Sequence, residues 1–188
     1  MAIYFTADTH FGHENIIRYC QRPFSSIEEH DAALIKNWNS VVQKNDEVYV
    51  LGDFIFAKTA LEVESVAGRL NGRKYLIRGN HDRVNICESS FIWIKDYHEM
   101  GANNLKWILC HYPFSEWDGF YRKNRTVHLH GHVHNNHETC PPLDRRINVG
   151  VDLHGFTPIR AKKLASRLER EAIKAGSAEF SSSGGDQL

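Results

Sequence analysis

Five short apolar stretches of the chain are each followed at once by side chains that can bind metal ions. The stretches IYFTA, VYVLG, YLIRG, KWILC and VHLHG each predict a strand. In open α/β sheets, loops beyond the carboxyl ends of the strands converge on the ligand site. An oxygen and nitrogen donor set without a thiolate suits Mn²⁺, Fe²⁺, Co²⁺, Ni²⁺ or Zn²⁺. The residues concerned are Asp8, His10, Asp53, Asn80, His81, His111, His132 and His134.

The segment VHLHGHVHNNH, residues 127–137, holds five of the twelve histidines, and they fall into three groups. Two follow the glycine, where one tight loop after a strand can present both to the same site. Two precede it on the strand, where histidine is usually a hydrogen-bonded sheet residue. The fifth lies in the polar stretch NNHETCPP and is expected to be solvated. The groups are, respectively, His132 and His134, His128 and His130, and His137.

The first half of the chain alternates strand signals with helix signals. Buried strands are predicted over residues 3–6, 48–51 and 75–77. Capping boxes at Ser26-x-x-Glu29 and Thr59-x-x-Glu62 predict two helix starts, and Gly72 predicts the end of the second helix. This order of elements favours a parallel sheet with helices packed on it.

The second half changes character. Strands are predicted over residues 91–94, 105–110, 127–130 and 147–151 with no long helix between them, which favours a second, largely antiparallel sheet. A last helix is predicted over residues 160–175. The polar stretch GSAEFSSSGGDQL, residues 176–188, is expected to be disordered, either as a natural tail or as a foreign remnant.

Composition sets bounds on the class of protein. The 188 residues suit a single domain, and 23 basic residues balance 23 acidic ones, which gives no general attraction to nucleic acid or anionic membranes. Four widely separated cysteines suggest a reduced protein rather than a disulfide scaffold. The amino terminus has no basic region of a signal peptide, and no apolar run is long enough to span a bilayer. We therefore expect a cytoplasmic protein without a membrane partner.

The ordered motifs resemble the signature of the calcineurin-like metallophosphoesterases. They are Asp8-x-His10, Gly52-Asp53, Gly79-Asn80-His81-Asp82, His111 and Gly131-His132-x-His134. The segment NVGVDLHGFTPI, residues 148–159, also resembles small bacterial and phage members of that family. The resemblance implies an α/β fold in which two mixed sheets pack as a sandwich flanked by helices. It implies one such domain over residues 1–175.

The same resemblance implies two divalent ions, with Mn²⁺ favoured, and a hydroxide between them as the nucleophile. A metal can lower the pKa of a bound water to roughly 7. Asp53 would bridge the ions. One ion would also bind Asp8, His10 and His134, and the other Asn80, His111 and His132.

His81 and Asp82 receive catalytic roles by resemblance. His81 would stabilise the phosphoryl oxygens or protonate the leaving group, and Asp82 would orient its imidazole.

Three further residues are candidates for substrate binding. His13 either touches the phosphate or caps the short helix that follows it. Arg22 and Arg78 can clamp phosphate oxygens, although surface ion pairing is the commoner fate of arginine. The aromatic and basic segment 112–126 is either a base-stacking wall or a loop pinned to the core.

The segments between the predicted ligands are too short for a separate cap domain, so we favour a phosphodiesterase. The protein would bind a phosphorylated small molecule or a nucleotide-type substrate. A phosphomonoesterase acting on a small nucleotide or a phosphoprotein is the alternative. A nuclease would need a basic track, and a protein-binding scaffold of the same fold would have lost ligands, so both are disfavoured.

Overall fold

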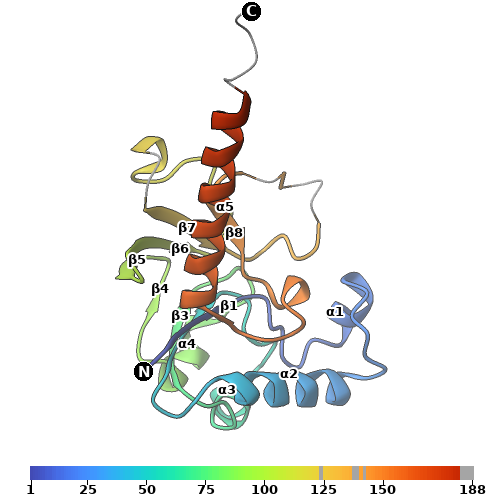
Figure 1. Ribbon diagram of the computed structural model, residues 1–188. Coiled ribbons are helices and arrows are strands. Elements are labelled where there is room, and N and C mark those ends of the chain that lie inside the picture. Colours follow the sequence, from blue (N-terminus) through green and yellow to red (C-terminus); the bar gives the residue numbers. More distant parts are fainter. Residues whose placement is uncertain (123–124, 137–139, 142, 183–188) are drawn as a thin grey trace, which may run out of the picture.

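We describe the fold from a computed structural model, which covers residues 1–122, 125–136, 140–141 and 143–182 (Figure 1). His137 therefore lies outside the described residues. Two β-sheets form the centre, with helices α2 (Ile27–Val41) and α3 (Ala60–Ala67) on one side. The long helix α5 (Ala161–Ser182) contacts strands β1 (Ile3–Thr6) and β9 (Ile159–Arg160) at one edge of the first sheet. The predicted α/β fold with two mixed sheets and flanking helices is confirmed.

The first sheet has the order β4-β3-β2-β1-β9. Strands β1 (Ile3–Thr6), β2 (Glu47–Leu51), β3 (Arg73–Ile77) and β4 (Ile94–Lys95) run parallel, and β9 (Ile159–Arg160) pairs antiparallel with β1. The three predicted N-terminal strands are confirmed. The predicted strand 91–94 is shorter than expected and joins this sheet rather than the second one.

The second sheet has the order β5-β6-β7-β8, with strands Tyr97–Ala102, Leu105–Cys110, Thr126–His130 and Arg146–Asn148. Only β5 runs antiparallel, and the β6–β7 and β7–β8 pairs are parallel. The prediction of a largely antiparallel sheet is therefore wrong. Strand β5, YHEMGA, was not predicted, because its residues alternate between exposed and half-buried positions without an apolar run.

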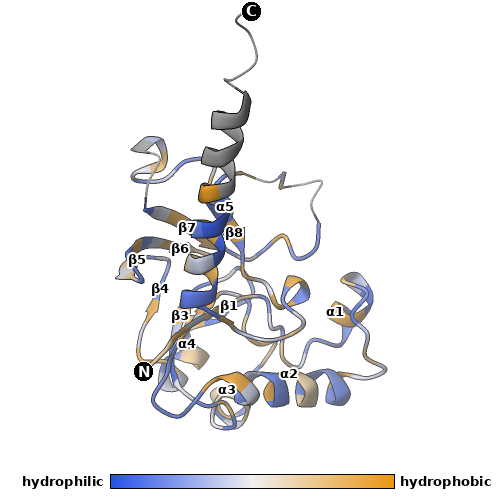
Figure 2. Ribbon diagram, viewed as in Figure 1, coloured by the Kyte–Doolittle hydropathy of each residue, from blue (hydrophilic) through white to orange (hydrophobic). Residues whose placement is uncertain are grey.

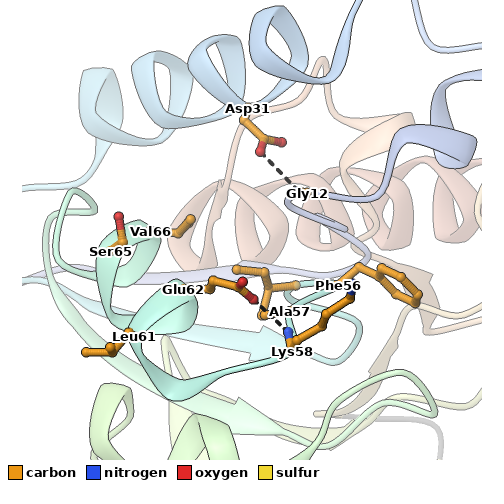
Figure 3. A pocket seen from close by; sticks show the side chains of 10 residues that line it. Gly12, Asp31, Phe56, Ala57, Lys58, Leu61, Glu62, Ser65 and Val66 are labelled. Carbon is orange, nitrogen blue, oxygen red and sulfur yellow. Dashed lines mark hydrogen bonds between the residues drawn. The ribbon is translucent and has the colours of Figure 1, made fainter.

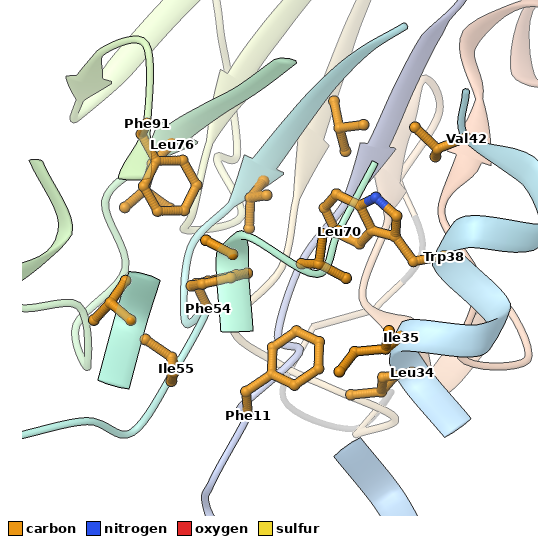
Figure 4. Packing of buried hydrophobic residues seen from close by; sticks show 14 of the residues in the cluster. Phe11, Leu34, Ile35, Trp38, Val42, Phe54, Ile55, Leu70, Leu76 and Phe91 are labelled. Atoms are coloured by element: carbon orange, nitrogen blue, oxygen red, sulfur yellow. The ribbon is translucent and has the colours of Figure 1, made fainter. Parts of the chain in front are cut away.

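Period-two alternation in the first sheet builds two separate cores. Val48 and Val50 face α2 and α3, whereas Tyr49 and Leu51 point between the two sheets. Figure 4 shows Trp38 and its neighbours on α2 packed onto the outer core. In Figure 2, α2 accordingly combines hydrophobic and hydrophilic residues. Because both faces of the first sheet are covered, its strands are held rigidly.

The helix starts were predicted better than the helix ends. Ser26 caps α2, and Thr59 with Glu62 forms a capping box on α3. However, α3 ends at Ala67, and Gly72, with φ +88°, lies in the turn before β3. Helix α5 continues past the predicted end at Ala175 to Ser182, so the start of the expected polar tail is helical. The remaining helices are the short α1 (Glu14–Tyr19) and α4 (Val84–Cys87).

Among the residues that the structure covers, no helix combines the length and apolar character needed to cross a membrane.

Candidate metal centre

The carboxyl ends of five strands meet at one edge of the sandwich. Asp8 and His10 follow β1, Asp53 follows β2, and Asn80 follows β3. The second sheet contributes His111 after β6 and two histidines after β7. A cavity of about 790 Å³ opens there, and its lining includes His10, His13, His81, His132 and His134. The structure therefore brings the seven predicted ligands together.

Asp53 lies between the two halves of this cluster. Its Oδ2 is 3.5 Å from His10 Nε2 and also 3.5 Å from His111 Nε2. His10 belongs to the group with Asp8 and His134, whereas His111 lies beside Asn80. One carboxylate oxygen thus faces both groups, as a bridging ligand would.

The donor atoms on either side of Asp53 are suited to cations. His10 Nε2 is buried and has no hydrogen-bond partner within the described part of the chain. His111 Nδ1 donates to Leu51 O at 2.8 Å, which leaves Nε2 as a lone-pair donor. Asn80 Oδ1 lies 3.0 Å from both His111 Nε2 and His132 Nδ1. Donor atoms that crowd together in this way fit the metal ions that the sequence motifs predict.

Two groups of side chains around the centre have ligand atoms within 4.8 Å of one another. The first, Asp8, His10 and His134, matches three of the four ligands expected for one ion. The second contains Asp8, Asp53 and His111, so Asp8 lies closer to the second group than the sequence led us to expect.

Five of the seven predicted ligands have left-handed backbones. The φ angles of Asp8, His10, Asp53, His132 and His134 lie between 49° and 71°. Such a conformation costs a non-glycine residue about 1–3 kcal/mol and persists only where surrounding contacts impose it. Three of the five, His10, His132 and His134, line the shared cavity, while Asp8 and Asp53 are buried beside it. The sequence motifs did not predict these left-handed conformations.

Glycines let the ligand loops approach one another. A Cβ on Gly79 would lie 2.2 Å from Asp53 Oδ1 and 2.4 Å from Asp53 N. A Cβ on Gly131 would lie 2.7 Å from Asp8 Oδ2. The glycines of the Gly-Asn-His and Gly-His-x-His motifs are thus required by close contact with a predicted ligand that follows another strand.

Burial shifts the pKa values of two predicted ligands, Asp8 and His10. Burial raises the pKa of Asp8 to about 6, against the opposing effect of His134 and His111. Burial, together with the neighbouring His134 and Arg22, holds the pKa of His10 well below its usual value. The site therefore contains a carboxylate whose charged form is penalised by burial and an imidazole that stays neutral, and a cation would stabilise the first and bind the second.

His134 depends on Asp152, a residue that the sequence analysis did not single out. Its Nδ1 lies 2.9 Å from Asp152 Oδ2. Burial opposes the charged imidazole, but hydrogen bonds to Asp152 and Cys20 raise the pKa of His134 to about 10. Cys20, His134 and Asp152 form a third compact group of potential ligand atoms. Asp152 lies in the NVGVD stretch, whose match to small family members was the available signal.

Arg22 supports His134 through Asp152, and its buried side chain is not accessible to a phosphate. Its side chain is fully buried, and all five N–H groups have partners: Asp152, the carbonyls of Asp8 and Thr9, and His30. We therefore correct its expected role from phosphate clamp to support of the loop that carries Asp8 and His10.

Asp82 also lies elsewhere than the sequence suggested. Its carboxylate accepts the backbone N–H groups of Asp53 and Phe54 at 2.8 and 2.9 Å, and that of Gly79 at 2.8 Å. In the described structure it makes no hydrogen bond to the His81 imidazole. We correct its role to fixing the Asp53 loop against the Gly79 loop.

The remaining candidates differ in their access to the cavity. His81 is exposed at the cavity mouth, and its ring lies 5.5 Å from that of His10. The backbone N–H of His81 donates to Asp53 Oδ1 at 2.9 Å. His13 Nδ1 lies 3.2 Å from His10 Nδ1, and its side chain makes no cap bond to α1. Arg78 is half-exposed and pairs with Asp96 at 2.7 Å, which corresponds to the surface alternative.

The two histidines on strand β7, His128 and His130, lie on the outer face of the second sheet. His128 and His130 are buried there, and each forms hydrogen bonds with backbone atoms. Phe114 stacks on His128 with ring centroids 4.7 Å apart, and Trp117 packs beside it. The described part of segment 112–126 is thus largely pinned to the sheet, although Tyr112 still packs against His111 and His132.

Comparison with known proteins places these residues in a family context. A model of the calcineurin-like phosphoesterase superfamily domain matches residues 1–151. An uncharacterized protein of Methanocaldococcus jannaschii is 37% identical over 180 residues, covering 91% of this chain and 93% of that protein. The gene 66 protein of Mycobacterium phage L5 is 28% identical, over 81% of this chain and 87% of its own length.

Among solved structures, a protein of unknown function from Aquifex aeolicus has a similar fold. Its TM-score is 0.73 at 29% identity, and the match covers 88% of this chain and 98% of that one. The likeness extends over almost the whole length of that protein.

Proposed function

Because the chain belongs to the calcineurin-like phosphoesterase superfamily, we propose that it is a phosphodiesterase that uses two divalent metal ions, with Mn²⁺ favoured. The single observation that carries this proposal is the position of Asp53 Oδ2, 3.5 Å from Nε2 of both His10 and His111. A carboxylate that bridges two ions offsets their repulsion and holds them close together.

The residues divide into two ligand sets around Asp53. Asp8, His10 and His134 would hold one ion, and Asn80, His111 and His132 the other. When bound, the ions would neutralise charge on the phosphoryl oxygens and activate water at neutral pH. Asp152 holds Nδ1–H of His134, so that a metal ion would bind at Nε2 and displace the proton there.

His81 is the residue that we propose for proton transfer. Its imidazole is exposed at the cavity mouth, while its backbone N–H is anchored to Asp53. In this position it can donate a proton to the leaving oxygen of a substrate held at the ligands. Its neighbour Asp82 acts by holding the Asp53 loop and does not assist the imidazole directly.

The type of substrate and the cellular location of the protein form part of the same proposal. A site without a cap domain accepts phosphates that carry two organic groups, so we favour phosphodiesters over monoesters. Balanced charge gives a long nucleic acid little attraction. The four cysteines are free thiols, which suits the cytoplasm.

The proposal is tested by removing metal and restoring Mn²⁺, Ni²⁺ or Zn²⁺ separately. Turnover of a generic phosphodiester is then compared with that of the corresponding monoester. We expect no turnover without metal, recovery with Mn²⁺, and faster cleavage of the diester. Inactivity towards both esters with every ion would refute the enzymatic function, and a monoester preference would refute the substrate class.

A further inference from the structure

A second cavity adjoins the metal centre. It has a volume of about 720 Å³ and lies between helices α2 and α3 (Figure 3). Its lining includes Gly12, Asp31, Phe56, Lys58, Leu61 and Ser65. Phe56 also lines the cavity that contains the proposed ligands. The two cavities therefore meet at one aromatic side chain.

The Phe56 ring is exposed yet held in a defined position. It stays 56% exposed although it is large and apolar. It stacks on the His13 ring at 4.7 Å and 19°, and the His13 ring is 5.2 Å from that of His10. The Phe56 backbone donates to Phe11 O at 2.8 Å, and the adjacent Gly12 N–H donates to Asp31 at 3.0 Å. A flat apolar surface is thus fixed one ring away from the metal ligands.

The charges around the second cavity indicate what it can hold. Among its described lining residues, Asp31 and Glu62 outnumber the single cation Lys58. Glu62 accepts backbone N–H groups of Lys58 and Thr59, which fixes the start of α3. A second phosphate would be repelled by the two carboxylates. An uncharged group fits this cavity better than a phosphate does. Leu61, which is 76% exposed, contributes apolar surface to the lining.

We propose that the second cavity binds a planar aromatic group on the alcohol side of the phosphoester, of the kind that a nucleoside supplies, stacked against Phe56. The inference rests on the proposed function, because it places the phosphate at the metal centre. Stacking on an aromatic side chain tolerates any base, since every base has a π-face.

The test compares AMP with ribose 5-phosphate, which lacks the base, on the Mn²⁺-loaded protein. Binding is measured by calorimetry, and inhibition is measured against a generic phosphodiester. We expect AMP to bind about tenfold more tightly than ribose 5-phosphate, a typical gain from one stacked base. Equal affinities would overturn the inference. Turnover of the generic ester in the same assay keeps this failure distinct from a failure of the proposed function.

Substitutions at Phe56 then separate stacking from simple apolar contact. Phe56→Trp should keep the preference for AMP, whereas Phe56→Leu and Phe56→Ala should reduce the affinity ratio to about one. Ser65→Tyr, which fills the cavity from α3, should have the same effect. The control is Tyr121→Ala, which removes a 74% exposed aromatic that is not among the lining residues of either described cavity. A preference that survives Phe56→Leu would overturn the stacking assignment.

Discussion

Arg22 and Asp152 form a buried, bidentate ion pair across 130 residues of sequence. Arg22 Nε donates to Asp152 Oδ1 at 2.8 Å, and Nη2 donates to Oδ2 at 2.9 Å. The same Oδ2 lies 2.9 Å from His134 Nδ1, and Nη2 also donates to the carbonyl of Asp8. One ion pair therefore supports proposed ligands from both sheets.

We expect Asp152→Asn to weaken metal binding by roughly 10- to 100-fold, because His134 loses the carboxylate that orients it. The free energy of unfolding should fall by roughly 3 kcal/mol, since a buried guanidinium loses its charged partner. Metal titration and urea unfolding measure the two effects. The matched control is Glu171→Gln, in the exposed pair with Arg167, which should change neither. Unaltered metal affinity in Asp152→Asn would show that His134 does not need this support.

Asp53→Asn should lose metal and activity together, because a neutral amide cannot bridge two cations. Metal content after dialysis and turnover with excess Mn²⁺ are the measurements. A variant that retains two ions would contradict the bridging role.

His81→Ala should keep its metal but lose turnover by about 10²- to 10⁴-fold, the usual contribution of a general acid. The loss should be large for alkyl leaving groups and small for 4-nitrophenolate, which departs without a proton. An equal loss for both leaving groups would argue that His81 binds the substrate and does not protonate it.

Gly79→Ala should displace the Asp53 loop, because the new Cβ would lie 2.4 Å from Asp53 N. We expect weaker metal binding and a loss of about 1–3 kcal/mol in stability. The control is Gly101→Ala on β5, where no described atom lies within 4 Å of the added Cβ. Gly101→Ala should change the free energy of unfolding by no more than about 0.5 kcal/mol. Similar effects of both substitutions would mean that the close contact is not what selects glycine.

His128 should make the fold acid-sensitive. Its Nδ1 bonds Ile108 O at 3.0 Å and its Nε2 accepts Phe114 N–H at 3.0 Å, which one neutral tautomer satisfies. Burial lowers its pKa to about 4 from 6.5. Between these values the unfolded chain binds more protons, so stability is complete above pH 6.5 and is lost as the pH falls towards 4.

Urea unfolding between pH 7.5 and 4.5 measures this effect. His128→Gln should be less stable at neutral pH, with a shallower decline on acidification, by up to about 1.4 kcal/mol per pH unit. An identical slope in both proteins would assign the acid sensitivity to other groups.

The sequence alone predicted the first sheet and the convergence of the proposed ligands. Strands β1, β2 and β3 carry apolar runs, and the carboxyl ends of parallel strands meet at one edge. The helix starts were readable because a capping box is a local hydrogen-bond pattern. Strand β5 and the end of α3 were not readable, since half-exposed strands and helix ends depend on the surrounding packing.

Only the tertiary structure decided how the ligands are held. Asp82 adjoins His81 in sequence, yet it bonds the Asp53 loop, because backbone N–H groups of the loops after β2 and β3 donate to its carboxylate. Arg22 was predicted to clamp phosphate or to pair at the surface, and it is buried against Asp152, 130 residues away. The left-handed backbones of Asp8 and Asp53 likewise reflect contacts between loops. A motif specifies which side chains reach the site, but the stacking of the two sheets determines their partners.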